Sequence, residues 1–203
     1  MIAIIDYGMG NLKSVKRKMD RIGVNSIITS DPSEIKKSCK IILPGVGHFT
    51  RAVLEIKNRG LWALLTEQVL IEKKIVLGIC LGMQLMANHS EEGDTDGFGW
   101  IDANVIRFKI TDTARYKIPH MGWNTVNQTK ESTLFEQIQF NSEFYFVHSY
   151  HIKCNNAVDI LAETNYDYLF TSAIQKENII GVQFHPEKSH DAGEILLRNF
   201  INM

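Results

Sequence analysis

The sequence is poor in the features that mark secreted, membrane and nucleic-acid-coating proteins. It has 3 cysteines among 203 residues, too few for a disulfide framework, and the odd count fits a reducing compartment. Lys and Arg number 22 against 23 Asp and Glu, so no basic excess exists to hold nucleic acid or an anionic membrane. The longest mostly apolar run, residues 75–87, spans 13 residues and contains two glycines, too short to cross a bilayer. The start, MIAIIDYG, has no basic segment and is unlike a secretory signal. We therefore expect a cytoplasmic enzyme or binding module.

The remaining composition is that of a folded globular protein. Hydrophobic residues make up 44% and charged residues 22% of the chain, and the length suits one ordinary domain with a full core. No linker, repeat or low-complexity tract divides the sequence. We expect residues 1–203 to form a single domain.

The first half of the chain alternates short apolar runs with helical patterns. Strands are expected at 2–5, 24–29, 41–43 and 75–79, and helices after Asn11, over 54–74 and over 81–89. Strands that are apolar throughout indicate a parallel sheet covered on both faces. In the second half the expected strands are 104–108, 144–148, 160–164, 170–174 and 179–184, before a helix over 193–201. The predicted fold class is α/β, a mixed and mostly parallel open sheet with helices on both faces, plus a strand-rich antiparallel portion.

The sharpest local signal is the segment Gly78-Ile79-Cys80-Leu81-Gly82. It lies where a predicted strand turns into a predicted helix, and it is the G-x-nucleophile-x-G pattern of a nucleophile elbow with Cys in place of Ser. The glycines make room for a sharp turn in which a Cβ would clash. The start of the following helix favours thiolate over thiol. The alternative interpretation is a buried spectator cysteine, but the strand–turn–helix context favours Cys80 as a nucleophile.

A cysteine nucleophile needs a base, and the base needs a partner that orients it. His185 ends the apolar run 179–184 and is followed by Pro186 and Glu187. Pro186 breaks the strand, so His185 and Glu187 are expected at the carboxyl edge of the sheet, where α/β active sites lie. Taken alone, such a histidine is more often structural. Together with the elbow, the pattern predicts a Cys80–His185–Glu187 triad.

Acyl transfer also needs hydrogen-bond donors for the developing oxyanion. The backbone N–H of Leu81 is the expected first donor, since it directly follows the nucleophile. A second could come from the loop Pro44-Gly45-Val46-Gly47, whose glycines let a peptide rotate toward the substrate. The alternative is a simple Pro-Gly turn, which the sequence alone does not exclude.

Signals for nucleotides and metals are weak. The sequence has no phosphate-binding G-x-x-x-x-G-K-[ST], and Gly8-x-Gly10 falls short of a dinucleotide fingerprint. His148, His151 and Cys154 are spaced by three and would not share one strand face. We expect no metal and no cofactor.

Several motifs together resemble one family over residues 1 to about 200. The elbow and the triad resemble the two signatures of class I, triad-type glutamine amidotransferases, which have a flavodoxin-like core. Within that family, other segments are similar to the glutaminase subunits of imidazole glycerol phosphate synthases: Asp6-Tyr-Gly-Met-Gly-Asn11-Leu-Lys-Ser-Val15, Leu43-Pro-Gly-Val-Gly47, Pro119-His-Met-Gly-Trp-Asn124, Tyr145-Phe-Val-His-Ser-Tyr150 and Gly181-Val-Gln-Phe-His-Pro-Glu-Lys-Ser189.

The resemblance implies a chemistry and a role for each matching residue. Cys80 would attack the side-chain amide of glutamine and form a γ-glutamyl thioester, with His185 as base and then acid and Glu187 orienting it. Water would then release glutamate, and no cofactor is implied. The loop Gly45-Val46 would supply the second oxyanion donor. Residues Gly47, Gln84, His148, Ser149 and Tyr150 would surround glutamine, and Asn11, Met121, Trp123 and Lys188 would face a partner.

The implied partner is a (β/α)8-barrel cyclase in a heterodimer, which uses the ammonia to make imidazole glycerol phosphate and an aminoimidazole carboxamide ribotide in histidine biosynthesis. The residues independently indicate an acceptor. Free ammonia is mostly protonated at neutral pH and must be used promptly, yet the chain has no synthase domain and no phosphate loop to consume it. We expect the isolated chain to be nearly inactive until the partner and its ligand bias the Gly45–Val46 peptide.

Two positions depart from the histidine-pathway pattern and leave the acceptor open. His151 stands where those subunits more usually carry another aromatic residue, and His190 where they more usually carry Gly. Both residues are similar to those found in a paralogous branch of the family, whose subunits supply ammonia for sugar-nucleotide modification in surface polysaccharide synthesis. Histidine biosynthesis remains the first hypothesis. Two other classes compete with it: a Cys hydrolase or peptidase on a similar sheet, and a non-catalytic regulatory subunit, against which the intact triad argues.

Overall fold

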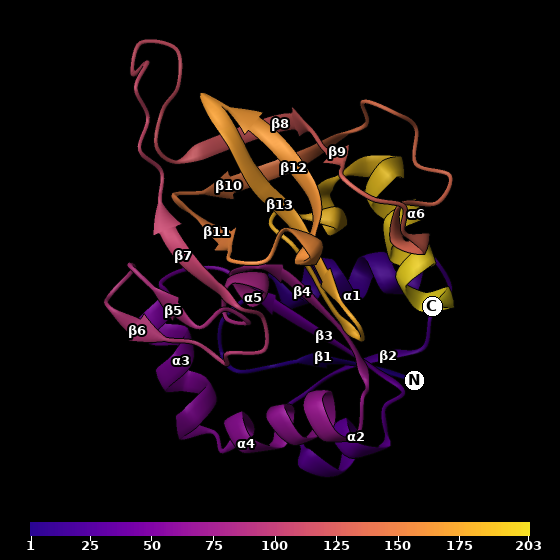
Figure 1. The fold of residues 1–203 in the computed structure, drawn as a ribbon. Helices are drawn as coiled ribbons and strands as arrows, with labels where there is room; N and C mark the ends of the chain where they lie inside the picture. Colours follow the sequence, from indigo (N-terminus) through magenta and orange to yellow (C-terminus); the bar gives the residue numbers. More distant parts are fainter.

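A single mixed sheet organises the computed structural model, which describes residues 1–203 (Figure 1). Its 12 strands follow the order β2-β1-β3-β4-β14-β13-β11-β7-β5-β6, with β12 on β13 and β9 on β12. The parallel part comprises β1 (Ile2–Ile5), β2 (Ser26–Thr29), β3 (Lys40–Gly45), β4 (Ile75–Cys80) and β14 (Ile179–Val182). The antiparallel part comprises β13 (Tyr168–Lys176), β11 (Tyr150–Cys154), β7 (Ala103–Arg107), β12 (Ile160–Tyr166) and β9 (Asn127–Gln128), and β5 (His89–Ser90) pairs parallel with β7 and antiparallel with β6 (Thr95–Asp96). This is the predicted mixed α/β class.

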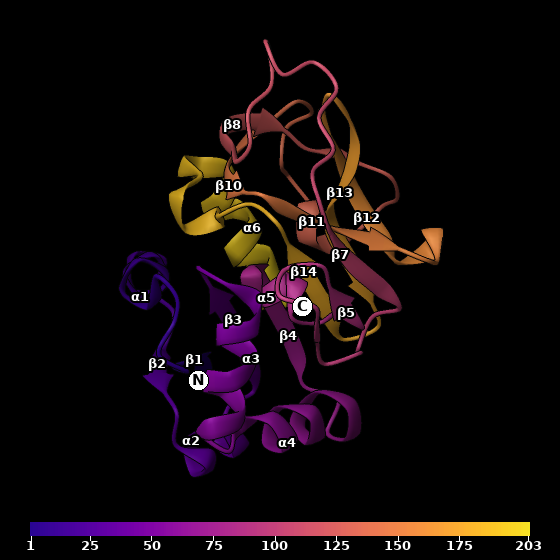
Figure 2. The ribbon, with the colours of Figure 1, turned by 90° about the vertical axis from the view of Figure 1, so that its left-hand side faces the viewer.

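Helices cover the parallel strands on both faces. The helices are α1 (Leu12–Arg21), α2 (Pro32–Lys37), α3 (Phe49–Asn58), α4 (Leu61–Thr66) with a π-helical continuation (Glu67–Ile71), α5 (Leu81–Gln84) and α6 (His190–Asn202). Single 3₁₀ turns occur at Thr133–Phe135, Ala157–Asp159 and Pro186–Lys188. Figure 2 shows α1 and α6 on the side of the sheet away from α4. The strands are therefore buried on both faces, as their uninterrupted apolar sequences predict.

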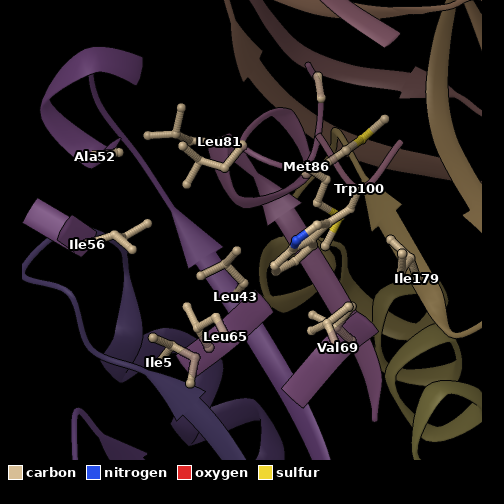
Figure 3. Close-up of a cluster of buried hydrophobic side chains, with 14 of the residues drawn as sticks. Ile5, Leu43, Ala52, Ile56, Leu65, Val69, Leu81, Met86, Trp100 and Ile179 are labelled. Atoms are coloured by element: carbon tan, nitrogen blue, oxygen red, sulfur yellow. The ribbon is translucent and has the colours of Figure 1, made fainter. Parts of the chain in front are cut away.

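Alternate residues of the strands contribute to two separate cores. In β1, Ala3 and Ile5 pack with α2, α3 and α4, whereas Ile2 and Ile4 pack with α1 and α6. Figure 3 shows the first core, in which Ile5 and Leu43 from the sheet meet Leu65 and other helix residues. Burying one such side chain stabilises the fold by roughly 1.5–3 kcal/mol. These cores hold the carboxyl ends of β3, β4 and β14 in a fixed register.

The helix expected over 81–89 is much shorter in the structure, and that prediction was wrong in its length. The helix α5 ends at Gln84. The carbonyls of Leu85, Met86 and Ala87 accept hydrogen bonds from the backbone N–H groups of Phe98, Ile101 and Gly99. The N–H groups of Met86 and Ala87 bond to carbonyls three residues back, and that of Asn88 bonds to Ala103, so the i+4 pattern of an α-helix does not continue.

Other elements differ from the sequence predictions. The helix over 54–74 divides at Gly60 as expected, but its first part starts earlier, at Phe49. Asn11 occupies the cap position of α1 without a capping side-chain hydrogen bond. The helix α2 was not predicted. Asp31 caps it by accepting a hydrogen bond from the N–H of Ser33 at 2.6 Å.

A two-stranded ribbon lies over the strand-rich half and was only partly predicted. It pairs β8 (His120–Thr125) antiparallel with β10 (Glu143–His148) (Figure 1). The strand β8 was not predicted, because it contains Gly122 and Asn124, residue types that are depleted in strands. Gly122 has a φ of 135°, which is open to glycine but strained for other residues. No helix in the structure combines the length and the apolar character needed to cross a membrane.

Candidate active site

Cys80 occupies a strained backbone position at the end of β4. Its φ is 55° and its ψ is −113°, outside the regions that non-glycine residues usually adopt. A Cβ at Gly78 would lie 2.7 Å from the Met83 nitrogen, and one at Gly82 would lie 1.7 Å from the Leu43 carbonyl oxygen. The steric reason for both glycines is therefore confirmed. The turn projects the cysteine out of the sheet between β3 and β14.

His185 and Glu187 follow β14, which pairs parallel with β4, so the sheet brings them to the same edge as Cys80. Nδ1 of His185 is 2.9 Å from Glu187 Oε1, and both side chains are 1% exposed. Burial on its own would lower the pKa of His185. The Cys80 sulfur and the Glu187 carboxylate oppose it and raise that pKa to about 10. The arrangement suits an imidazole that Glu187 orients near the Cys80 sulfur.

A cavity of about 310 Å³ opens in front of Cys80. It is lined by Val46, Gly47, Cys80, Leu81, Gln84, Glu92, Pro119, Val147, His148, Ser149 and Tyr150. All five residues expected around glutamine are therefore on its wall. Among the expected oxyanion residues, Val46 and Leu81 line the cavity, whereas Gly45 lies behind it, where a Cβ would meet the Tyr7 hydroxyl at 2.5 Å.

Two wall residues were missed by the sequence analysis. Glu92 belongs to the segment after β5, and its Oε2 accepts a hydrogen bond from the N–H of Phe49 at 2.8 Å. Pro119 precedes β8 and reaches the cavity from the ribbon. Pro119 begins a segment that carries the family resemblance but was given no role in the cavity, and Glu92 stands in no quoted motif; each reaches the cavity through tertiary folding.

A chain of hydrogen bonds connects the ribbon to the cavity. Nδ1 of His148 is 2.8 Å from the carbonyl oxygen of Tyr150, so this nitrogen carries the proton and donates. Nε2 of His148 then accepts from Nδ1 of His120 at 3.0 Å. Burial lowers the pKa of His120 to about 4 and that of His148 well below its ordinary value, so both rings are neutral donors and acceptors.

The four residues expected to face a partner lie around one edge of the molecule. Met121 and Trp123 are 65% and 43% exposed on β8. The ring of Tyr145 connects Trp123, at 5.9 Å between centroids, with the Lys188 ammonium, at 5.2 Å. Asn11 immediately precedes α1, which packs against the turn Pro186–Lys188. The geometry brings these residues together, and their role as an interface stays a prediction.

No group of three or more His, Cys, Asp or Glu side chains is placed to hold a metal ion. Cys154 is separate from the site, and burial raises the pKa of its thiol to about 12. Cys80 is the cysteine that shares a cavity with polar groups.

A family model described as glutamine amidotransferase class-I matches residues 3–203, so the chain belongs to the class-I glutamine amidotransferase family. Among curated proteins it is 51% identical to imidazole glycerol phosphate synthase subunit HisH 2 of Methanococcus maripaludis, over 99% of this chain and 98% of the relative. It is 44% identical to subunit HisH 1 of the same strain, over the full length of both chains. A solved structure titled as a glutamine amidotransferase superimposes with a TM-score of 0.77 at 16% identity, covering 100% of this chain and 98% of the other.

Proposed function

We propose that this chain is the glutaminase subunit of an imidazole glycerol phosphate synthase. It hydrolyses glutamine to glutamate and ammonia and passes the ammonia to a (β/α)8-barrel cyclase for histidine biosynthesis. The observation that carries the proposal is that the pairing of β14 with β4 brings the His185–Glu187 pair to the same sheet edge as Cys80, which lines a small cavity. The full-length similarity to HisH subunits supports the choice of acceptor.

The reaction uses two acyl-transfer steps. The Cys80 thiolate attacks the side-chain carbonyl carbon of glutamine, and the C–N bond breaks as His185 gives its proton to the leaving nitrogen, which departs as ammonia. Neutral His185 then removes a proton from water, which attacks the thioester. Glutamate leaves and the Cys80 thiolate re-forms beside protonated His185. Glu187 holds the imidazole in one orientation throughout.

The wall of the cavity suits the functional groups of glutamine. The Glu92 carboxylate is positioned for the α-ammonium group, and the backbone of residues 147–150 for the rest of the amino-acid moiety. Both N–H bonds of the Gln84 side chain are engaged, with the Tyr150 carbonyl at 2.9 Å and Gln183 at 2.8 Å. Its Oε1 is therefore left to accept from a carboxamide N–H, a donor that glutamine has and glutamate lacks.

The developing oxyanion would be held by two backbone groups. The N–H of Leu81 is one, because Leu81 follows the nucleophile and lines the cavity. The second would come from the neighbouring Gly45–Val46 peptide, whose Val46 lines the cavity. Losing one such donor typically costs about 3 kcal/mol of transition-state stabilisation. A partner that reorients this peptide would therefore control the rate.

The partner surface is proposed to comprise Asn11, Met121, Trp123 and Lys188. Exposed Met and Trp side chains are typical of interface centres, and Lys188 beside the triad connects this surface to the site. A barrel cyclase seated here would receive ammonia close to Cys80, before it is protonated in solvent.

A second acceptor, a sugar-nucleotide-modifying enzyme of surface polysaccharide synthesis, is favoured by one structural detail. His190 has a φ of 43°, which is strained for histidine and relaxed for glycine, and its ring stacks on Trp123 at 4.7 Å within the proposed partner surface. A strained residue at such a place fits a changed partner. Methanococcus maripaludis has two numbered subunits, and this chain is more similar to HisH 2, at 51% identity, than to HisH 1, at 44%.

The first test measures glutamate release by the chain alone and by the chain with its barrel cyclase and acceptor ligand. We expect little turnover alone and strong activation in the complex, and a loss of about 10³-fold or more in Cys80→Ser and His185→Ala. A glutamine-mimicking diazo-ketone should label Cys80. High turnover by the isolated chain would contradict the partner control, and absence of a Cys80 adduct even in the complex would overturn the proposed function.

The second test separates the two acceptors. A histidine-auxotrophic strain that lacks this subunit should grow without histidine when the chain is expressed. The matched control is the Cys80→Ser chain, which should not rescue growth. Failure of the wild-type chain, in a strain where it labels at Cys80, would favour the sugar-modifying acceptor.

A further inference from the structure

Gln183 is a fully buried polar residue that the mechanism above does not use. It follows β14 and is 0% exposed, and its Nε2 donates a hydrogen bond to the Sγ of Cys80 at 3.6 Å. The two residues are 103 positions apart in the sequence and meet because β14 pairs with β4. A buried amide that contacts the nucleophilic atom calls for a functional explanation.

The Tyr150 carbonyl fixes the orientation of the Gln183 amide through the Gln84 side chain, which contacts both. The Tyr150 oxygen can accept only, so the Gln84 group at 2.9 Å from it is the NH₂ group. The second N–H of that group is 2.8 Å from Gln183, which must therefore present its oxygen to Gln84. The NH₂ group of Gln183 is consequently directed at the sulfur, and the opposite orientation would leave two donors facing each other.

The Gln183 donor lies nearer to the Cys80 sulfur than the Val147 carbonyl, which could accept from the thiol. A protonated Cys80 could donate to the Val147 carbonyl, but that oxygen is 4.0 Å away. A thiolate accepts the N–H of Gln183, and hydrogen bonds to an ionised acceptor are about twice as strong as neutral ones. The helix α5 that follows Cys80 has only 4 residues, so a helix dipole adds little here.

We propose that Gln183, oriented by Gln84, stabilises the Cys80 thiolate by donating an amide hydrogen bond to it. Gln183 is then a catalytic residue that touches the reacting atom, and Gln84 is its positioning residue as well as a wall of the cavity. The assignment rests on the proposed function in taking Cys80 as the nucleophile. It adds that the ionisation of Cys80 depends on a neutral donor from β14 in addition to His185.

The test measures alkylation of Cys80 by iodoacetamide as a function of pH, on the full chain without glutamine. Peptide mass spectrometry separates the Cys80 adduct from adducts of Cys39 and Cys154. Gln183→Met removes the donor and keeps the length of the side chain, and the midpoint of the alkylation profile should move up by about one pH unit. Gln183→Glu keeps the shape and offers acceptors when ionised, so its midpoint should also rise.

The control is Gln68→Met, the same change at another buried glutamine, which lies in the π-helical segment before β4 and not at its carboxyl end. Its midpoint should equal that of the wild type. Far-ultraviolet circular dichroism identifies which variants are folded, and Gln183→Glu serves if Gln183→Met is not. A folded Gln183 variant with an unchanged midpoint overturns the inference. Absence of partner-dependent glutaminase activity in the wild-type chain would instead overturn the proposed function. The alkylation profiles would still show whether Gln183 stabilises the Cys80 thiolate.

Discussion

At the scale of single residues, backbone strain marks the proposed nucleophile, Cys80. Cys80 adopts a backbone conformation that L-residues avoid, and the register of β4 with β3 and β14 holds it there. Strain of this kind typically costs about 1–3 kcal/mol per residue. The fold thus tolerates a local cost in return for a sulfur that faces the cavity beside His185.

This strain predicts an unusual order of stability at position 80. In ordinary helices and strands Gly is less stable than Ala by roughly 0.5–1 kcal/mol. At a φ of 55° and a ψ of −113° the order should reverse, because glycine relaxes there and alanine does not. We expect the free energy of unfolding of Cys80→Gly to exceed that of Cys80→Ala by about 1 kcal/mol in urea titrations. The usual order, with Ala more stable, would show that the turn is unstrained.

At the scale of elements, the site depends on how closely the turn after β4 packs against β3. The backbone of Gly82 touches the Leu43 carbonyl so closely that no side chain fits between them. This contact aligns the Pro44–Gly47 loop with the nucleophile, since both follow from the same pair of strands. The proposed oxyanion loop and the proposed nucleophile are therefore positioned together.

A substitution at Gly82 should accordingly be severe. Gly82→Ala places a methyl group 1.7 Å from the Leu43 oxygen, and we expect the free energy of unfolding to fall by about 3 kcal/mol or more. Gly23→Ala is the matched control. Gly23 has a φ of 76° with nothing within 4 Å of the added carbon, so it should lose about 1–2 kcal/mol from backbone strain alone. Equal losses in urea titrations would contradict the packing argument.

How much of the site could be predicted depended on the kind of contact. Cys80, His185 and Glu187 stand in short patterns whose spacing reflects local mechanics, a sharp turn and a broken strand. Glu92 reaches the cavity through a hydrogen bond to the start of α3, which no local pattern records. The predicted length of α5 was wrong for a similar reason, because the N–H of Asn88 bonds to the distant Ala103 carbonyl instead of continuing the helix. Contacts between distant segments set the details that the sequence analysis missed.

At the scale of the whole molecule, buried histidines link stability to pH. Burial lowers the pKa of His120 to about 4 and also lowers the pKa values of His148 and His151. Between the folded and unfolded pKa values the unfolded chain binds more protons, so stability must decrease as the pH falls below about 6.5. His185 acts in the opposite sense, because its pKa is raised to about 10 and its contribution is lost as the pH rises toward that value.

The largest acid effect that can be isolated belongs to His120. A shift from about 6.5 to about 4 corresponds to a loss of about 2 kcal/mol by pH 5. His120→Asn keeps an N–H to donate to His148 and removes the titration, so the difference in unfolding free energy between pH 7.5 and pH 5 should shrink by about that amount. His89→Asn is the control. Asp96 and Asp94 raise the pKa of His89, so removing its titration should not reduce the loss of stability at pH 5. A His120→Asn chain as acid-sensitive as the wild type would contradict the assignment.

The position of β14 has a consequence for how the protein is made. The strand β14 sits between β4 and β13 in the sheet, although its residues are synthesised about a hundred positions after those of β4. A growing chain on the ribosome therefore carries Cys80 long before it carries His185, Glu187 or Gln183. Until β14 inserts, β4 has an unpaired edge that is open to wrong pairing, and the thiol has no base. On the proposed mechanism, ammonia production therefore requires a chain that has been translated and folded through β14, so incomplete chains release none.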